Sequence, residues 1–473
     1  MGIQFSKQLI QKERGESMSD KQRDYIYYDW TQTLCPKCLK LVNTKIIFEN
    51  SKVYQLKRCP EHGEIKILIS IDEEYYRKCR DFVKPSEMPN RWNTEIKKGC
   101  PFDCGLCPDH EQHSCVTVLE ITEKCNLDCR VCYSSSGTDV NLKHRTMTEI
   151  EYMLDQIMLN EGMADIVQIS GGEPTTHPNF FEILDLARTK NIRHLMINTN
   201  GVKIANEDGF AEKLLAYMPG IEIYLQFDGL TKDVSENLRG IDLTDIRKKA
   251  LNKLNEINLS TTLVTVVKKG INTHEIGEVI KIGIESKAVR GVTFQPIQEE
   301  GRVENYNQEE NRLTLSEVRK NIIEQSLFID DDIIPVPCHP DALAMGYALK
   351  LNGSLVPLTR MIDPDILLEG RRNTIVLESD EDLKAKVLDV LSAAHSPESA
   401  KDSLMDLLCC LPQVQVDVPE NITYENVFRI IIMEFADRYN LDVRSVKKSC
   451  VHIAHTDGRI IPFETFNIFN RGK

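Results

Sequence analysis

The cysteines are the residues of this sequence whose number and spacing point to chemistry. The chain has 473 residues, of which 15 are cysteines. An odd count in so long a chain argues against a disulfide framework, and reduced thiols are more often metal ligands or catalytic groups. Eleven cysteines lie between Cys35 and Cys132. We therefore expect the metal chemistry to be concentrated near the front of the chain.

The strongest cysteine pattern follows the first predicted strand of the main part of the chain. Cys125, Cys129 and Cys132 are separated by three and two residues. Three thiolates at this spacing on a loop can ligate three irons of a [4Fe–4S] cluster. The fourth iron then has no protein ligand, and an open coordination site is what a catalytic metal centre needs. A structural zinc site with a distant fourth ligand is the alternative.

A glycine-rich loop, Gly171-Gly172-Glu173-Pro174, follows the second predicted strand. Two glycines remove Cβ atoms and let the backbone approach a ligand closely. Free backbone N–H and C=O groups, together with the Glu173 carboxylate, suit an ammonium group. A Gly-Gly pair between a strand and a helix is usually only a turn, so the specific signal is its combination with the cysteine loop.

Together, these two loops resemble the two best motifs of the radical S-adenosylmethionine (SAM) superfamily. The resemblance implies that the three cysteines hold the cluster and that SAM chelates the open iron through its amino and carboxylate groups. Reduction of the cluster then cleaves SAM to methionine and a 5′-deoxyadenosyl radical. The resemblance also implies that Gly172 and Glu173 hold the amino group. The sequence departs from the family pattern at Val131, where an aromatic residue is frequent, and Tyr133 follows the third cysteine.

Polar residues at the ends of later predicted strands are further candidates for the cofactor site. By the same resemblance, they line the ribose, carboxylate and adenine sites or the substrate pocket. These candidates are Asn198, Asp228, Arg239 and Gln295. An Asn-Gly sequence after a strand is most often a turn, and an aspartate can merely cap a helix.

A second cluster-type run precedes the cysteine loop. It consists of Cys100, Cys104, Cys107 and Cys115. Four thiolates in sixteen residues, with turn-favouring glycine and proline between them, can close an auxiliary [4Fe–4S] site, and a zinc ion with four cysteines is the alternative. His110 and His113 are spare ligand candidates, although solvated loop histidines are the commoner outcome.

The remaining cysteines form a front module and a scattered set. Cys35, Cys38 and Cys59 need a fourth ligand for one iron or zinc ion: the Cys-Pro-x-His-Gly knuckle favours His62, whereas an even division of the thiols favours Cys79. A histidine would favour zinc. The scattered set could form a third cluster only through folding, and buried free thiols are the alternative. Its members are Cys338, Cys409, Cys410 and Cys450.

The elements that must position these residues follow a βα repeat. Helix-like segments separate six predicted strands, at residues 116–121, 165–170, 194–198, 221–227, 261–267 and 291–297. Strands that alternate with helices imply parallel βαβ units. Six strands are too few for a closed eight-stranded barrel, so we predict an α/β fold with a partial (β/α)6 TIM-like barrel, with its chemistry at the carboxyl ends of the strands. Thr148 and Glu151 are placed to form the capping box of the first helix, and Asn272 or Thr273 to cap the last.

The sequence divides into five segments around that barrel. We predict a leader at 1–30, a rubredoxin-like or zinc-ribbon module at 31–85, an auxiliary iron-sulfur segment at 86–115, the barrel at 116–312 and an α+β extension at 313–473. Within the extension, 316–331 and 384–395 are typical of helices, and 451–466 of a hairpin that turns at 456–458. The amphipathic stretch 428–439 could border a lipid entry, although such stripes usually face a core.

The order of the cysteine motifs, with the closing stretches Cys450-Val-His-Ile and Asp457-Gly-Arg-Ile-Ile-Pro-Phe, sharpens the resemblance. From about residue 30 onward the chain is similar to the archaeal tetraether lipid synthase group, which was first linked to methylation of a dihydropterin. This resemblance implies several [4Fe–4S] clusters and a rubredoxin-like metal. It departs around Cys338, where the chain has fewer cysteines than that group leads us to expect.

Composition limits the function further. The net charge of −14, without a basic block, argues against a nucleic-acid partner. We expect no membrane span and no secretory signal, hence a cytoplasmic enzyme with at most peripheral membrane contact. The predicted activity is carbon–carbon bond formation or methyl transfer on a lipid chain or pterin, driven by a reduced flavodoxin or ferredoxin. A peptide-modifying radical SAM enzyme and a non-catalytic zinc scaffold are the alternatives.

Overall fold

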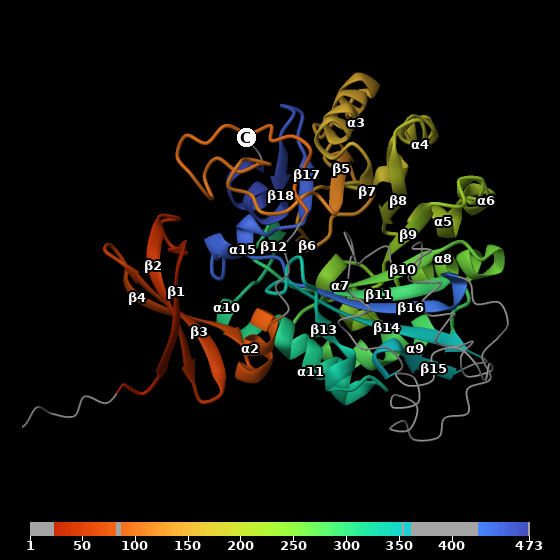
Figure 1. Cartoon of the computed structure of the whole chain (residues 1–473). Coiled ribbons are helices and arrows are strands. Elements are labelled where there is room, and N and C mark those ends of the chain that lie inside the picture. Colours follow the sequence, from red (N-terminus) through yellow and green to blue (C-terminus); the bar gives the residue numbers. More distant parts are fainter. Residues whose placement is uncertain (1–22, 82–86, 352–353, 361–423, 472–473) are drawn as a thin grey trace, which may run out of the picture.

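The computed structural model describes residues 23–81, 87–351, 354–360 and 424–471 (Figure 1). Its N-terminal part is one antiparallel sheet with the order β1 (Ile26–Leu34), β2 (Leu41–Glu49), β3 (Lys52–Cys59) and β4 (Gly63–Ser70), followed by α2 (Glu73–Asp81). Alternate side chains are buried along these strands, so Ile46, Phe48 and Val53 form a small core of their own. Strand β1 begins within the stretch predicted as a leader.

The six predicted barrel strands are present and pair in chain order. They are β5 (Val116–Thr122), β7 (Ala164–Gly171), β8 (Ile192–Thr199), β9 (Ile221–Gln226), β10 (Thr261–Val267) and β11 (Val289–Pro296). All five pairings between neighbours are parallel. Nearly every residue in them is buried, as expected where helices cover one face and a barrel interior the other. The predicted fold class is confirmed.

Helices lie between consecutive barrel strands and form the outer layer seen in Figure 1. They are α3 (Met147–Glu161), α4 (Phe180–Arg188), α5 (Val202–Asn206), α6 (Phe210–Leu215), α7 (Lys232–Arg239), α8 (Thr244–Ile257) and α9 (Ile276–Glu285). The predicted capping box of α3 lies two residues earlier, at Thr146 and Glu149. Neither Asn272 nor Thr273 caps α9; the side chain of Asn272 instead donates to the backbone oxygens of Asp228 and Val266.

The C-terminal extension continues the barrel sheet at both ends. Strand β16 (Val427–Met433) is parallel to β11, and β17 (Val451–Ala454) is parallel to β5. Strand β14 (Leu343–Leu351) is antiparallel to β16. The amphipathic stretch predicted at 428–439 is therefore mainly a strand: Ile430 and Ile432 enter the core, whereas Ile431 and Met433 face a cavity.

Short elements complete the described residues. They are β6 (Val131–Cys132), β12 (Arg302–Val303), α10 (Gln308–Asn311), α11 (Leu315–Gln325), β13 (Ile334–Pro335), β15 (Ser354–Pro357), α15 (Val443–Lys447), β18 (Ile460–Pro462), α16 (Phe463–Thr465) and the 3-10 turn η1 (Pro174–Thr176). Helix α11 is shorter than the predicted 316–331, and β17 and β18 form the predicted hairpin. The helix predicted at 384–395 lies outside the described residues. Among those described, no helix is long and apolar enough to cross a membrane.

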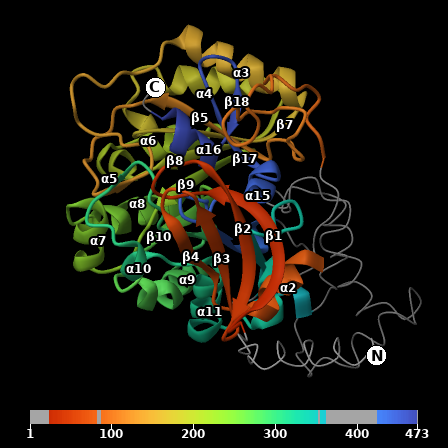
Figure 2. The ribbon, with the colours of Figure 1, turned by 90° about the vertical axis from the view of Figure 1, so that its left-hand side faces the viewer.

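Hydrogen bonds attach the N-terminal sheet to the rest of the molecule. Thr31 Oγ1 donates to Asp442 Oδ1 at 2.6 Å, and Ser70 Oγ donates to Ser316 Oγ at 3.0 Å. Arg319 of α11 lies over the ring of Tyr75 in α2, 4.3 Å from its centroid. Figure 2 looks onto this sheet, with α2 and α11 at its lower end. Ion pairs add to these contacts, among them Arg80 with Asp341 at 2.8 Å, so the module packs on the extension mainly through polar and charged groups.

Candidate functional site

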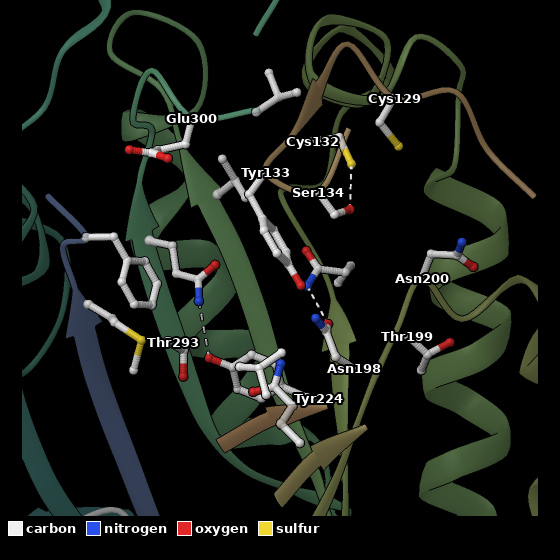
Figure 3. A pocket seen from close by; sticks show the side chains of 18 of the residues that line it. Cys129, Cys132, Tyr133, Ser134, Asn198, Thr199, Asn200, Tyr224, Thr293 and Glu300 are labelled. Carbon is white, nitrogen blue, oxygen red and sulfur yellow. Dashed lines mark hydrogen bonds between the residues drawn. The ribbon is translucent and has the colours of Figure 1, made fainter. Parts of the chain in front are cut away.

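A cavity of about 190 Å³ opens at the carboxyl ends of the barrel strands and reaches into the barrel interior. Figure 3 shows its wall, with Tyr133 near the centre and side chains from β8, β9 and β11 around it. Eight of the residues predicted for the cofactor site line this cavity: Cys125, Cys129, Cys132, Gly172, Glu173, Asn198, Arg239 and Gln295. The structure therefore gathers residues far apart in sequence at one place.

The thiols of Cys125, Cys129 and Cys132 all face this cavity. Burial and the nearby charge of Glu173 raise the pKa of Cys125 to about 12. The three sulfurs are not all within 4.8 Å of one another, in contrast to two other groups described below. A four-iron cluster takes one thiolate per iron, so it spreads its thiolates wider than a single tetrahedral ion does. The wider spacing of the sulfurs fits a cluster better than a single zinc ion.

The glycines of the Gly-Gly-Glu-Pro loop bring it against the cysteine loop. A Cβ on Gly171 would lie 2.2 Å from the Thr122 backbone oxygen, and one on Gly172 would lie 2.1 Å from that of Lys124. The Gly172 N–H donates to Thr122 O at 2.8 Å and the Glu173 N–H to Lys124 O at 2.9 Å. The sequence predicted that the backbone of these glycines approaches a ligand closely. In the structure it approaches the backbone of Thr122 and Lys124, at the start of the cysteine loop. These contacts hold the two loops together.

The carboxylate of Glu173 is fully buried and held by donors from two strand ends. Its Oε1 accepts from Thr175 Oγ1 at 2.6 Å and from Thr199 Oγ1 at 2.7 Å, and its Oε2 accepts from the Asn200 N–H at 2.8 Å. Burial raises its pKa, whereas these donors act in the opposite direction. With one donor on Oε2, that oxygen keeps a lone pair for an ammonium group. Pro174 continues into the 3-10 turn η1 and does not line the cavity.

Asn198, Gln226 and Arg239 form a chain of hydrogen bonds along the cavity wall. Gln226 Nε2 donates to Asn198 Oδ1 at 2.9 Å, and Arg239 Nη2 donates to Gln226 Oε1 at 3.1 Å. Asp228 lies behind this wall, fully buried, and accepts from Arg239 at 2.6 Å. It is not a cavity residue, so its place is to orient Arg239. Gln295 completes the opposite wall with a 3.5 Å contact to the Tyr224 hydroxyl.

Arg247 is a cavity residue that the sequence reasoning missed. It is almost fully buried and pairs with Asp228 through Nη2. Its Nε and Nη1 have no hydrogen-bond partner among the described residues. Two buried guanidinium groups share one carboxylate here, so an anionic group can still be accommodated in the cavity. This excess charge fits the carboxylate of an amino-acid moiety such as that of SAM.

The second cysteine run is divided between two places. Cys100, Cys104 and Cys107 line a small separate pocket, where Asp103 Oδ2 accepts from the backbone N–H groups of Lys97 and Gly99. Cys115, which directly precedes β5, does not line this pocket. The predicted set of four thus contributes three thiols to one site.

Cys115 instead lies with two thiols of the extension. The sulfurs of Cys115, Cys338 and Cys450 are within 4.8 Å of one another. His113 Nε2 is 3.4 Å from the Cys115 sulfur, and its Nδ1 is 3.0 Å from Glu161. His113 and His110 are both buried, contrary to the solvated positions expected of them. Cys409 and Cys410, predicted to join this set, lie outside the described residues.

The N-terminal sheet brings four ligand atoms together at its knuckles. Cys38 Sγ and Cys59 Sγ are 3.8 Å apart, and His62 Nδ1 is 3.5 Å from the sulfurs of Cys35 and Cys59. A tetrahedral ion with metal–sulfur bonds of about 2.3 Å separates its sulfurs by about 3.8 Å. Cys79 is buried in the main core beside Tyr75. The structure therefore offers His62, and not Cys79, as the fourth ligand.

Comparison with known proteins places this arrangement in a family. The sequence profile of the radical SAM superfamily matches residues 119–282, and that of an HMPTM N-terminal zinc ribbon domain matches 27–71. A 7,8-dihydro-6-hydroxymethylpterin dimethyltransferase of Methanocaldococcus jannaschii is 31% identical, over 93% of this chain and 94% of that protein. This chain belongs to the family of that dimethyltransferase, within the radical SAM superfamily. The predicted family is confirmed.

Other relatives are similar over a smaller part of the chain. The mycofactocin maturase MftC of Mycobacterium tuberculosis is 31% identical over 35% of this chain and 40% of that protein. A solved structure of Streptococcus suis SuiB is 21% identical, with a TM-score of 0.37 over 44% of this chain and 45% of that one.

Membership of the radical SAM family makes this chain an enzyme whose cofactors are a [4Fe–4S] cluster and SAM. The zinc-ribbon match and the grouped cysteines support additional clusters or a mononuclear metal. A non-catalytic zinc scaffold no longer accounts for the whole chain, because the radical SAM match and the lined cavity lie outside the ribbon.

Proposed function

We propose that this radical SAM enzyme transfers methyl groups to a reduced pterin. The named activity of its relative over nearly the whole chain supports this substrate. The cavity supports it as well, because six amide side chains line it: Gln168, Asn198, Asn200, Gln226, Gln295 and Gln298. A buried amide is costly without a partner, and a polar heterocycle can supply that partner whereas a lipid chain cannot. These amides, among which Gln298 Oε1 has no hydrogen-bond partner within the described residues, are the observation that carries the proposal.

The chain's own residues have distinct tasks in this proposal. Cys125, Cys129 and Cys132 hold the cluster. Gly172 and Glu173 bind the amino group of SAM, and the guanidinium groups of Arg239 and Arg247 bind its carboxylate. When bound, the cluster and SAM supply hydrogen abstraction from an unreactive carbon. Tyr133 and Phe463, whose ring centroids are 5.1 Å apart, exclude water from the space between the cofactor and the substrate.

The remaining metal groups are proposed to serve electron transfer or structure. Cys100, Cys104 and Cys107 form one auxiliary site, and Cys115, Cys338 and Cys450 form another. We propose that a reduced flavodoxin or ferredoxin in the cytoplasm supplies the electron. The zinc ribbon has a structural role, because its strands enclose only a small core.

The proposal is tested with the anaerobically reconstituted enzyme, SAM, dithionite and 6-hydroxymethyl-7,8-dihydropterin. We expect 5′-deoxyadenosine and a methylated pterin by mass spectrometry. Cys129→Ala should abolish both products, because the cluster loses a ligand. The same assay is run with lipid extracts, as the tetraether-type alternative requires, and with peptides. SAM cleavage that modifies a lipid or a peptide and leaves the dihydropterin unchanged would refute the proposed substrate.

A further inference from the structure

Glu300 is a buried carboxyl group in the cavity wall that the cofactor site does not use. It follows β11, lines the cavity and is 6% exposed. Its Oε1 has no hydrogen-bond partner within the described residues, and neither has Oε1 of Gln298, which lines the same wall. Two buried acceptors without donors are costly, so a ligand that brings N–H groups is the partner they fit.

Aromatic side chains line the same cavity as Glu300. The ring centroids of Phe435 and Phe463 are 4.0 Å apart, and both rings line the cavity with Tyr133. In the view of Figure 3, the Tyr133 ring stands between Glu300 and the two labelled cysteines, Cys129 and Cys132. Aromatic walls favour flat rings that stack on them. The aromatic side chains and the two unpartnered acceptors of this cavity are therefore suited to a flat ring that carries N–H donors.

The charges around Glu300 favour the same kind of ligand. Burial raises its pKa well above the usual value, and the nearby Asp437 and Glu464 raise it further, while Arg471 and Arg438 act in the opposite direction. Two adjacent N–H donors stabilise a carboxylate through two parallel hydrogen bonds. Such a ligand removes the cost of keeping this group charged in the cavity.

We propose that Glu300 recognises the substrate through two adjacent N–H donors of a flat heterocycle, as a 2-amino-4-oxopyrimidine ring presents them. The inference rests on the proposed function, because a pterin contains this ring. Glu173 and Glu300 are the carboxylates among the cavity-lining residues. Glu173 is assigned to the amino group of SAM, so Glu300 is the acidic group left for the substrate.

The test pairs a change in the protein with a change in the ligand. Binding of 6-hydroxymethyl-7,8-dihydropterin and of its 2-desamino analogue to the SAM-loaded, unreduced enzyme is measured by calorimetry for the wild type and Glu300→Gln. We expect Glu300→Gln to weaken binding of the dihydropterin about 10- to 100-fold, the range for a charge-assisted hydrogen bond. The analogue lacks the exocyclic amine, so its binding should change by less than about threefold.

Controls separate recognition from folding. Glu299→Gln changes the neighbouring carboxyl group, which contacts Tyr439 and does not line the cavity, and should bind the dihydropterin like the wild type. Iron content and the far-ultraviolet circular dichroism spectrum of Glu300→Gln should match those of the wild type. Equal losses for both ligands, or no loss for either, would overturn the assignment of Glu300 while leaving the pterin activity intact. A wild-type enzyme that neither binds nor methylates the dihydropterin would overturn the proposed function itself.

Discussion

At the scale of single residues, the fourth ligand of the zinc ribbon is the histidine that the structure places beside the three cysteines. An even division of the cysteines among metal sites had favoured Cys79 instead. His62 lies within bonding range of the same ion as the three knuckle cysteines, whereas Cys79 is buried beside Tyr75. We predict that His62→Ala lowers the metal content of the ribbon by about one ion per chain. Cys79→Ala should keep that ion, at a cost of about 1–2 kcal/mol for a lost buried side chain. Mass spectrometry of the metal content checks both variants.

Gly172 tests whether the two cofactor loops must be in contact. A Cβ at this position would lie 2.1 Å from the Lys124 backbone oxygen, which cannot rotate away as a side chain can. We predict that Gly172→Ala displaces the cysteine loop and lowers SAM cleavage at least tenfold. Gly209→Ala is the matched control, because a Cβ there meets nothing within 4 Å. That control should lose only the roughly 1 kcal/mol of a strained left-handed residue and keep its activity.

The sequence located the cofactor loops but not their partners. Cysteine spacing and the Gly-Gly-Glu-Pro turn are local signals, so their residues could be predicted and the structure brings them to one cavity. Arg247 is a helix residue and Glu300 follows a strand, and neither has a local pattern that distinguishes it from ordinary surface charge. Only folding shows that both side chains are buried.

At the scale of elements, β16 is held to the barrel by a buried ion pair. Arg429 Nη2 donates to both carboxylate oxygens of Glu222 on β9 at 2.6 Å. Burial would raise the pKa of Glu222, but the charges of Arg429 and His194 hold it well below its usual value. We predict that Arg429→Met destabilises the fold by about 3–5 kcal/mol, because it leaves a buried charge without its main partner. Urea unfolding followed by circular dichroism measures this loss.

The double variant Arg429→Met/Glu222→Gln is the control for this pair. Removal of both charges leaves no uncompensated carboxylate, so it should be more stable than Arg429→Met alone. A double variant that is less stable than the single one by the full cost of Glu222→Gln would show that the two residues act independently.

The six barrel strands could be predicted because each is a short apolar run between helix-like segments. Strands β16 and β17 could not be assigned to the same sheet, since their partners β11 and β5 are more than a hundred residues away in sequence. The stretch around Ile430 illustrates the difficulty. An apolar run of this length has no periodicity that separates a buried strand from a buried helix.

At the scale of the whole molecule, one cysteine group is assembled from distant parts of the chain: Cys115, Cys338 and Cys450. Cys115 precedes the first barrel strand, Cys338 follows the last one, and Cys450 precedes β17, which pairs with β5. Counting the thiols along the sequence placed Cys115 with its neighbours in the chain. The parallel pairing of β17 with β5 is what carries Cys450 to Cys115 instead.

This regrouping predicts which cysteine variants behave alike. Cys115→Ala, Cys338→Ala and Cys450→Ala should each lower the metal content by the same amount, because each removes one ligand of one centre. The double variant Cys338→Ala/Cys450→Ala should lose no more metal than either single variant. Adding Cys107→Ala should lower the metal content further, because Cys107 lines a separate pocket. Iron and zinc counts per chain, with electron paramagnetic resonance of the reduced protein, measure these losses. If the double variant Cys115→Ala/Cys107→Ala instead loses no more metal than either single variant, the four cysteines between 100 and 115 share one centre. The pairing of β17 with β5 would then not be what assembles that centre.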